Sequence, residues 1–69
     1  MGEVVNLTKR EREIIFLITK ALCRKNIAKN LNISLHTVDT HIRHIHLKTN
    51  THSIAELIVW AFGTNYLLT

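Results

Sequence analysis

Apolar residues recur at steps of three and four positions along most of the chain, which is the spacing of one face of an α-helix. The clearest case lies between Ser34 and Lys48, where the recurring apolar residues are Leu35, Val38, Ile42 and Ile45. Together with the polar breaks between segments, this spacing predicts helices at about residues 9–20, 24–31, 35–48 and 54–64. The pattern therefore predicts an all-α domain of four helices.

Capping residues mark the beginnings of three of these helices. Thr8 and Glu11 have the spacing of a capping box, and Ser53 and Glu56 repeat that spacing before the last segment. Ser34 is a good N-cap for the third segment, because its hydroxyl can accept a hydrogen bond from a backbone N–H of the first turn. These local signals support the helix boundaries that the apolar spacing predicts.

The same spacing predicts which side chains face the core. They are Ile14, Leu17, Ile18 and Ala21 in the first segment, Ile27, Ala28 and Leu31 in the second, Leu35, Val38, Ile42 and Ile45 in the third, and Ile54, Leu57, Ile58 and Ala61 in the fourth. Phe16 lies away from this stripe and is expected to be exposed. Asn32 can end the second helix in the left-handed conformation, and Asn65 or Gly63 can end the fourth.

The composition agrees with one small helical domain. The 69 residues are 46% hydrophobic and 20% charged, with no proline and two glycines, which favours helices over a turn-rich β fold. We expect residues 1–6 to be a flexible lead-in and residues 7–69 to form the domain. Cys23 is the single cysteine, so an intramolecular disulfide is excluded. No signal peptide or membrane span is visible, so we expect a cytoplasmic, nucleoid-associated protein without a membrane partner.

Positive charge is concentrated in the middle of the chain. The whole sequence has a formal net charge of +4, and residues 20–48 hold six basic residues against one acidic residue, Asp39. A basic surface of this kind is typical of proteins that bind polyanions. Charge by itself does not distinguish a nucleic-acid partner from a merely solvated surface, so both interpretations stay open at this point.

The outward side of the third segment favours the first interpretation. His36, Thr40, Arg43 and Leu47 fall opposite the apolar stripe, where a surface helix usually carries Glu and Lys. Hydrogen-bonding side chains of this kind suit contact with a polar, anionic surface. A short helix, a three-residue turn and a longer helix with a polar outer side describe a helix-turn-helix.

Three motifs then suggest a family. The stretches L-T-x-R-E-x-E-I at Leu7–Ile14, K-x-I-A at Lys25–Ala28 and L-x-I-S-x-x-T-V-x-x-H at Leu31–His41 resemble the LuxR/GerE-type helix-turn-helix. The similarity continues through Ile45 and Lys48 and covers nearly the whole chain. The order and spacing of the motifs agree with that family.

The resemblance implies a four-helix DNA-binding domain that regulates bacterial transcription, either as a stand-alone GerE-like regulator or as the output domain of a longer one. Its third helix, residues 34–48 here, would enter the major groove, and its fourth would mediate dimerisation. The chain departs from the family pattern at Asp39, where Lys or Arg is usual, and at Ala21, where Gly is usual. If Ala21 adopts a positive φ, this costs about 1 kcal/mol relative to Gly.

The proposed DNA contacts follow from side-chain chemistry. Arg43 can donate two hydrogen bonds to guanine, Thr40 can touch a thymine methyl or a base edge, and Asp39 can accept from cytosine N4. The residues expected at the phosphate backbone are Lys25, Ser34, His36, Thr37, His46 and Lys48. Ordinary solvation of each polar side chain is the alternative.

The fourth segment is apolar nearly all round, which exceeds what packing on one side requires. Val59, Trp60 and Phe62 are in surplus, and an apolar surplus marks an interface. We expect a homodimer through these side chains. The alternative is that Trp60, with Tyr66, Leu67 and Leu68, completes the domain's own core.

The five histidines raise two further hypotheses. His41 and His44 lie three positions apart on one helix, but no regular pattern of Cys or carboxylate ligands accompanies them, so no metal and no other cofactor is expected. Protonation of histidines close to phosphate would add positive charge. DNA affinity is therefore expected to rise from about pH 7.5 to about pH 6.0.

Other functions fit less well. The sequence has no nucleophile–base pair, glycine-rich phosphate loop or paired catalytic carboxylates, so an enzyme is not expected. The main alternative is a protein-interaction module whose fourth helix pairs with another regulator, with DNA binding weakened by Asp39. A promoter reader similar to sigma-factor region 4 is a third interpretation. RNA polymerase or another regulator stays open as a further protein partner.

Overall fold

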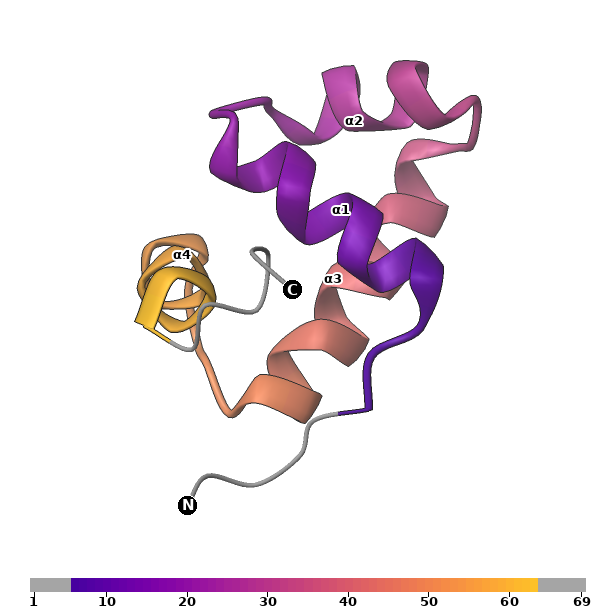
Figure 1. Ribbon diagram of the computed structural model, residues 1–69. Helices are drawn as coiled ribbons and strands as arrows, with labels where there is room; N and C mark the ends of the chain where they lie inside the picture. The colour runs from indigo at the N-terminus through magenta and orange to yellow at the C-terminus, as the bar shows by residue number, and fades with distance from the viewer. Residues whose placement is uncertain (1–5, 64–69) are drawn as a thin grey trace.

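The computed structural model describes residues 6–63, which form four α-helices (Figure 1). They are α1 (Lys9–Thr19), α2 (Arg24–Leu31), α3 (Leu35–Thr49) and α4 (Ile54–Gly63). The all-α prediction is confirmed, and each predicted boundary lies within one residue of the observed one. Most of the expected lead-in, the tail residues Tyr66 to Leu68 and the alternative helix end at Asn65 lie outside the described residues.

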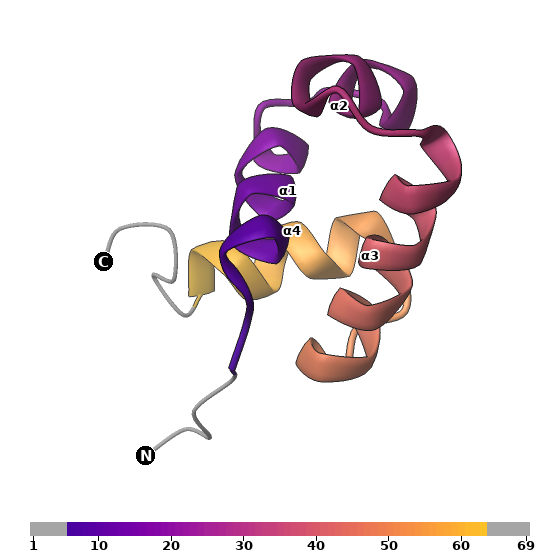
Figure 2. The same cartoon turned by 90° about the vertical axis from the view of Figure 1, so that its right-hand side faces the viewer.

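The four helices surround one core. In Figure 2, α1 and α3 run on opposite sides, α2 closes the top between them, and α4 crosses between the lower parts of α1 and α3. Each of α2, α3 and α4 contacts α1, and α3 also contacts α2 and α4. The arrangement leaves the side of α3 that faces away from α1 and α4 uncovered by any other described helix (Figure 2).

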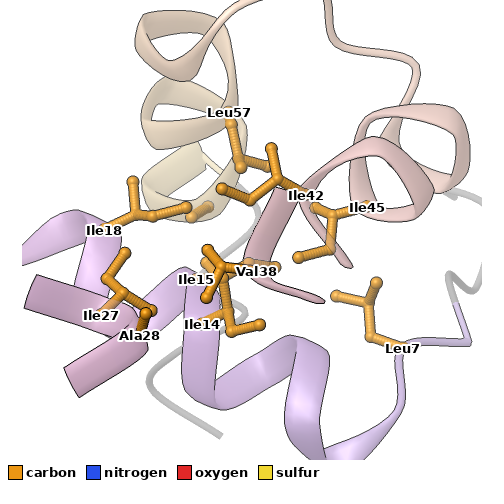
Figure 3. Packing of buried hydrophobic residues seen from close by; sticks show 11 residues of the cluster. Leu7, Ile14, Ile15, Ile18, Ile27, Ala28, Val38, Ile42, Ile45 and Leu57 are labelled. Carbon is orange, nitrogen blue, oxygen red and sulfur yellow. The ribbon is translucent and has the colours of Figure 1, made fainter. Parts of the chain in front are cut away.

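The core is built from branched aliphatic side chains of all four helices (Figure 3). The buried residues are Leu7, Ile14, Ile15, Ile18, Ile27, Ala28, Val38, Ile42, Ile45, Leu57 and Ala61. Leu17, Leu31, Ile54 and Ile58 are partly buried against this cluster. Most of the predicted inward positions are therefore confirmed. Phe16 is exposed, as expected.

Two predicted core positions were wrong, and two core residues, Leu7 and Ile15, were absent from the predicted inward positions. Ala21 is exposed, because α1 ends at Thr19 and the chain leaves the helical path before Ala21. Leu35 is 43% exposed, because it borders an open groove instead of lying in the closed core. Ile15 is fully buried, because α1 packs against three other helices, so its buried stripe is wider than one row.

The first three helices end in the same way. A residue with positive φ follows each helix: Ala21 (φ 64°), Asn32 (φ 57°) and Asn50 (φ 55°). The next N–H along the chain then donates to the carbonyl oxygen five residues earlier, which satisfies a helix-end acceptor. These bonds join Leu22 to Leu17 (3.4 Å), Ile33 to Ala28 (3.0 Å) and Thr51 to His46 (3.1 Å). Asparagine tolerates this backbone conformation well, whereas alanine is strained in it.

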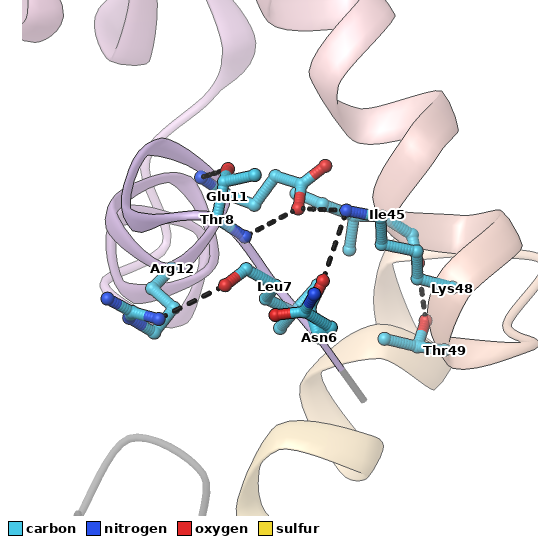
Figure 4. A network of polar contacts seen from close by, with 8 residues as sticks. All are labelled: Asn6, Leu7, Thr8, Glu11, Arg12, Ile45, Lys48 and Thr49. Carbon is cyan, nitrogen blue, oxygen red and sulfur yellow. Dashed lines mark hydrogen bonds and ion pairs between the residues drawn. The ribbon is translucent and has the colours of Figure 1, made fainter. Parts of the chain in front are cut away.

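The start of α1 is tied to the end of α3 (Figure 4). The predicted capping box is present, with the Glu11 N–H donating to Thr8 Oγ1 (3.1 Å) and the Thr8 N–H donating to Glu11 Oε1 (2.9 Å). The ammonium of Lys48 also donates to Glu11 Oε1 (2.8 Å) and to the carbonyl oxygen of Asn6 (3.2 Å). Glu11 is only 3% exposed, so this carboxylate is a buried charge with a paired cation.

The second capping box is formed only in part. The Glu56 N–H donates to Ser53 Oγ (3.1 Å), so Ser53 caps α4 as predicted. The Glu56 carboxylate instead accepts from the His52 N–H (2.6 Å), one residue before the expected donor. The Glu56 carboxylate therefore binds the backbone of the preceding turn instead of the backbone of the cap residue Ser53. None of the helices within residues 6–63 is long and apolar enough to cross a membrane.

Candidate nucleic-acid interface

The helix α2, the turn 32–34 and the helix α3 form the predicted helix-turn-helix. Ser34 caps α3, since its Oγ accepts from the Thr37 N–H (3.0 Å) and also lies 2.8 Å from Thr37 Oγ1. The residues at this helix start, Ser34, Leu35 and His36, are exposed, and the first N–H groups of a helix have no partner within it. Ser34 and Thr37 therefore lie where a helix N-terminus can meet a phosphate.

The outward side of α3 carries the predicted base contacts. Arg43 is exposed, and its guanidinium forms no ion pair with another side chain of residues 6–63. Thr40 is half-buried, and its hydroxyl donates to the His36 carbonyl oxygen (3.0 Å). This bond uses the single hydroxyl proton of Thr40, so the threonine presents a methyl group and an acceptor, but no donor, to a base edge. His36 is exposed one turn earlier.

Asp39 is paired with a residue that the sequence did not single out. Its Oδ1 lies 3.4 Å from Nε of Arg24, the first residue of α2. This is an ion-pair separation without hydrogen-bond geometry, and Oδ1 accepts no hydrogen bond from the described residues. The side chains of Asp39 and Arg24 remain 42% and 55% exposed, so the pair contributes about 1 kcal/mol or less to stability.

Lys48, predicted to contact the DNA backbone, is directed elsewhere. Its ammonium is held by Glu11 and Asn6 on the α1 side of the domain (Figure 4). Moving it to a phosphate would leave the buried Glu11 carboxylate without its cation. Lys25, in contrast, is exposed in the first turn of α2 and makes no ion pair within residues 6–63.

His46 is part of a hydrogen-bonded chain that fixes its tautomer. Thr49 Oγ1 donates its proton to the Ile45 carbonyl oxygen (2.9 Å), so Thr51 must donate in the bond between the two threonine hydroxyls (2.9 Å). Thr51 then has no proton for His46, and the 2.7 Å contact must be donated by His46 Nδ1–H. The neutral ring therefore has an unprotonated Nε2, which accepts hydrogen bonds and repels a phosphate.

The surroundings of His46 oppose its protonation. Burial lowers the pKa of His46, and the charges of Arg24 and His52 lower it further, whereas Glu56 raises it by less. The pKa of His46 is therefore below the ordinary histidine value. His46 is therefore a weaker backbone contact at neutral pH than the sequence suggested. The predicted rise of DNA affinity on mild acidification stays a prediction.

The helix α4 presents part of the predicted dimer surface. Val59 and Phe62 are 71% and 63% exposed, which is unusual for large apolar side chains in a small domain. Trp60 is instead partly buried against the core. For Trp60 this packing favours the alternative, in which it completes the core of its own chain.

Two features of the site were not visible in the sequence. Arg24 and Asp39 are 15 positions apart and Thr51 lies beyond the helix that holds His46, so no helical spacing joins these partners. The charge of Arg24 beside the helix-turn-helix was the one available signal. Within residues 6–63, no three His, Cys, Asp or Glu side chains lie close enough together to hold a metal ion.

Comparison with known proteins supports the helix-turn-helix interpretation. Residues 5–61 match the model of the family described as "Bacterial regulatory proteins, luxR family". This stretch covers α1, α2, α3 and most of α4.

Individual relatives agree with the family match. The chain is 36% identical over 63 residues to the probable transcriptional regulator ycf29 of Cyanophora paradoxa, covering 91% of this chain and 30% of the relative. It is 41% identical over 58 residues to the nitrate/nitrite response regulator protein NarL of Escherichia coli, covering 84% and 27%. It is 46% identical over 61 residues to the oxygen regulatory protein NreC of Staphylococcus epidermidis, covering 88% and 28%. The chain thus spans less than a third of the length of these relatives.

Proposed function

Because the chain belongs to the LuxR family of bacterial regulatory proteins, we propose that it binds double-stranded DNA through α3 and thereby regulates transcription. The observation that carries the proposal is the uncovered outer side of α3, on which Arg43 is exposed in the middle of the helix, while Ser34 caps an exposed helix start. A helix of this kind fits the major groove, which is wide enough to admit it.

Each side chain has a definite part in this proposal. Arg43 donates two hydrogen bonds to O6 and N7 of a guanine, which is the commonest specific contact in the major groove. Lys25 and the N-terminus of α3 at Ser34 bind phosphates and set the orientation of the helix without reading sequence. Thr40 supplies a methyl group for a thymine. Lys48 has no part, because it is held by Glu11.

We further infer that α4 joins two copies of the domain. The support is the exposure of Val59 and Phe62 on one helix, since isolated apolar side chains are common on surfaces but adjacent large ones mark an interface. A two-fold dimer would place two copies of α3 on two half-sites about one helical turn of DNA apart.

Fluorescence anisotropy tests DNA binding directly. A labelled mixed-sequence duplex of roughly 20–30 base pairs is titrated over a series of salt concentrations. Neutralisation of phosphates by Arg24 and Lys25 predicts a log–log slope of roughly −2 per domain. Absence of salt-dependent binding by the folded protein, even at low salt, would contradict the proposal.

The second candidate is an interaction module whose α4 binds another regulator. The exposed Val59 and Phe62 favour this candidate as much as they favour a homodimer. The same titration separates the two functions, because an interaction module needs no affinity for DNA. Charge on the outer side of α3, at Arg43, matters only for the DNA-binding function.

A further inference from the structure

Asp39 is an anionic side chain on the helix that is proposed to approach polyanionic DNA. It lies in the fifth position of α3, and the N-terminal residues of a recognition helix are the ones that contact base edges. An unpaired carboxylate there would be repelled by the phosphates. The structure instead places the Arg24 guanidinium 3.4 Å from Asp39 Oδ1, and this cation comes from another helix, α2.

The two oxygens of Asp39 differ in their surroundings. Oδ1 is shielded from solvent, although the side chain as a whole is 42% exposed. Since Oδ1 contributes almost nothing to that exposure, the accessible part of the carboxylate is Oδ2. Asp39 and Arg24 also border a groove of about 600 Å³ whose apolar side chains include Ile42 and Ile58.

We propose that Arg24 and Asp39 act as one reading unit that selects cytosine at one position of each half-site. Arg24 neutralises and orients the carboxylate through Oδ1, and Asp39 presents Oδ2 to an amino group in the major groove. This inference rests on the proposed DNA binding and adds a specific base preference to it. Asp39 is the specificity residue, and Arg24 is a positioning residue.

Base chemistry explains why the preferred base is cytosine. A carboxylate can only accept hydrogen bonds, so it requires a donor on the base edge. The major-groove edges of guanine and thymine present acceptors at O6, N7 and O4, which repel a carboxylate. Adenine offers an N6 donor, but its N7 acceptor lies beside it. Cytosine offers the N4 donor and has no acceptor on its own major-groove edge.

The pairing also allows the site to approach DNA. The ion pair is neutral as a whole, so insertion of Asp39 into the groove does not bring an uncompensated negative charge between phosphates. Arg24 is 55% exposed, so its guanidinium can face a phosphate while it stays close to Asp39. Asp39 is therefore compatible with DNA binding, and it changes which base is read.

Selection from a library of duplexes with a randomised core tests this inference. The wild-type pool should be enriched in cytosine at one position of each half-site, with a preference of roughly 5-fold or more over other bases. Asp39→Lys should replace that cytosine by guanine, and Asp39→Asn, which has nearly the same shape, should shift it toward adenine. Neighbouring positions read by Arg43 should stay unchanged in both variants.

Two further variants serve as controls. Glu13→Lys makes the same change of charge as Asp39→Lys, but on α1, where Glu13 is paired with Arg10, and it should leave the selected sequence unchanged. Arg24→Gln should reduce the cytosine preference, because the Asp39 carboxylate loses the cation that orients it, and should also weaken binding roughly 3- to 10-fold and lower the magnitude of the salt slope by about 1. Circular dichroism verifies that each variant is folded.

The outcomes separate this inference from the proposed function. If the wild type and both folded Asp39 variants select the same base at the position assigned to Asp39, the inference is overturned while DNA binding stands. Salt-dependent binding without any enriched sequence would also overturn it. Absence of all DNA binding by the folded wild type would overturn the proposed function, and the inference with it.

Discussion

Lys48 shows how a single side chain can be removed from an interface by its neighbours. The buried carboxylate of Glu11 holds the Lys48 ammonium at 2.8 Å, so Lys48 stabilises the fold instead of the complex. We expect Lys48→Met to lower the free energy of unfolding by about 1–3 kcal/mol, because Glu11 is left as a buried charge without its cation. Urea denaturation followed by circular dichroism measures this loss.

The matched variant is Lys25→Met, which removes an exposed cation of α2. It should leave stability within about 0.5 kcal/mol of the wild type and reduce the magnitude of the salt slope of DNA binding by about 1. Lys48→Met should leave that slope unchanged. A reduced slope in the Lys48 variant would mean that this lysine leaves Glu11 for a phosphate.

Ala21 is a strained residue in the turn between α1 and α2. Its φ of 64° places the Cβ close to the following carbonyl oxygen, a cost that glycine avoids. We expect Ala21→Gly to raise the free energy of unfolding by roughly 0.5–1 kcal/mol, measured by thermal and urea denaturation. The same change at Ala55, an exposed residue of α4, should lower it by a similar amount, because glycine is unfavourable in a helix.

At the scale of the element, α4 has two different apolar sides. Leu57 and Ala61 are buried in the core, whereas Val59 and Phe62 are exposed. If α4 joins two domains, Phe62→Glu should raise the dimer dissociation constant at least roughly 10-fold in sedimentation equilibrium, because a charge would enter an apolar interface. Phe16→Glu, on the exposed side of α1, is the control and should not change it. Equal association of both variants and the wild type would contradict a dimer through α4.

The helices were predictable because their signals are local. Capping by Thr8 and Ser34 and the left-handed end at Asn32 each involve residues at most five positions apart, and the structure shows all three. The errors lie where tertiary packing outweighs spacing. Ile15 is buried because α1 has neighbours on more than one side, and Leu35 is exposed because it borders an open groove.

The candidate site was less predictable than the helices. The outward side of α3 followed from helical spacing, and Arg43 is exposed there as expected. The pairs that modify the site are non-local: Lys48 with Glu11, 37 positions away, and Asp39 with Arg24 on another helix. Sequence spacing within one helix carries no information on such pairs. The partners of Lys48 and Asp39 could therefore be identified only in the folded structure.

At the scale of the whole molecule, acid should remove part of the stability through Glu11. Burial raises the pKa of Glu11, but hydrogen bonds from Lys48 and Thr8, with the charge of Lys48, lower it by more, so its net pKa is below the ordinary value. The unfolded chain then binds this proton more readily than the fold does. Stability from Glu11 is present above the ordinary carboxylate pKa and is lost as pH falls through the lower folded value. Glu11→Gln should flatten this part of a stability–pH profile.

A second, earlier loss of stability should come from His46. Its pKa in the fold is below the ordinary value of about 6.5, so the unfolded state gains the proton first as pH falls. Stability should therefore decline from about pH 6.5 downward until His46 is also protonated in the fold. His46→Gln should remove this decline while the Glu11 step remains. Identical stability–pH profiles of the wild type and His46→Gln would contradict a lowered pKa of His46 in the fold.

The link between Glu11 and Lys48 also has a consequence for the order of folding. The α2–turn–α3 unit forms from neighbouring residues, but this link closes a loop of 37 positions between the start of α1 and the end of α3. The entropy cost of closing a loop grows with its length, so we expect the link to form after the transition state. Lys48→Met should then accelerate unfolding and leave the refolding rate nearly unchanged in stopped-flow experiments. The ion pair would therefore slow unfolding and prolong the lifetime of the folded domain, with little effect on the folding rate.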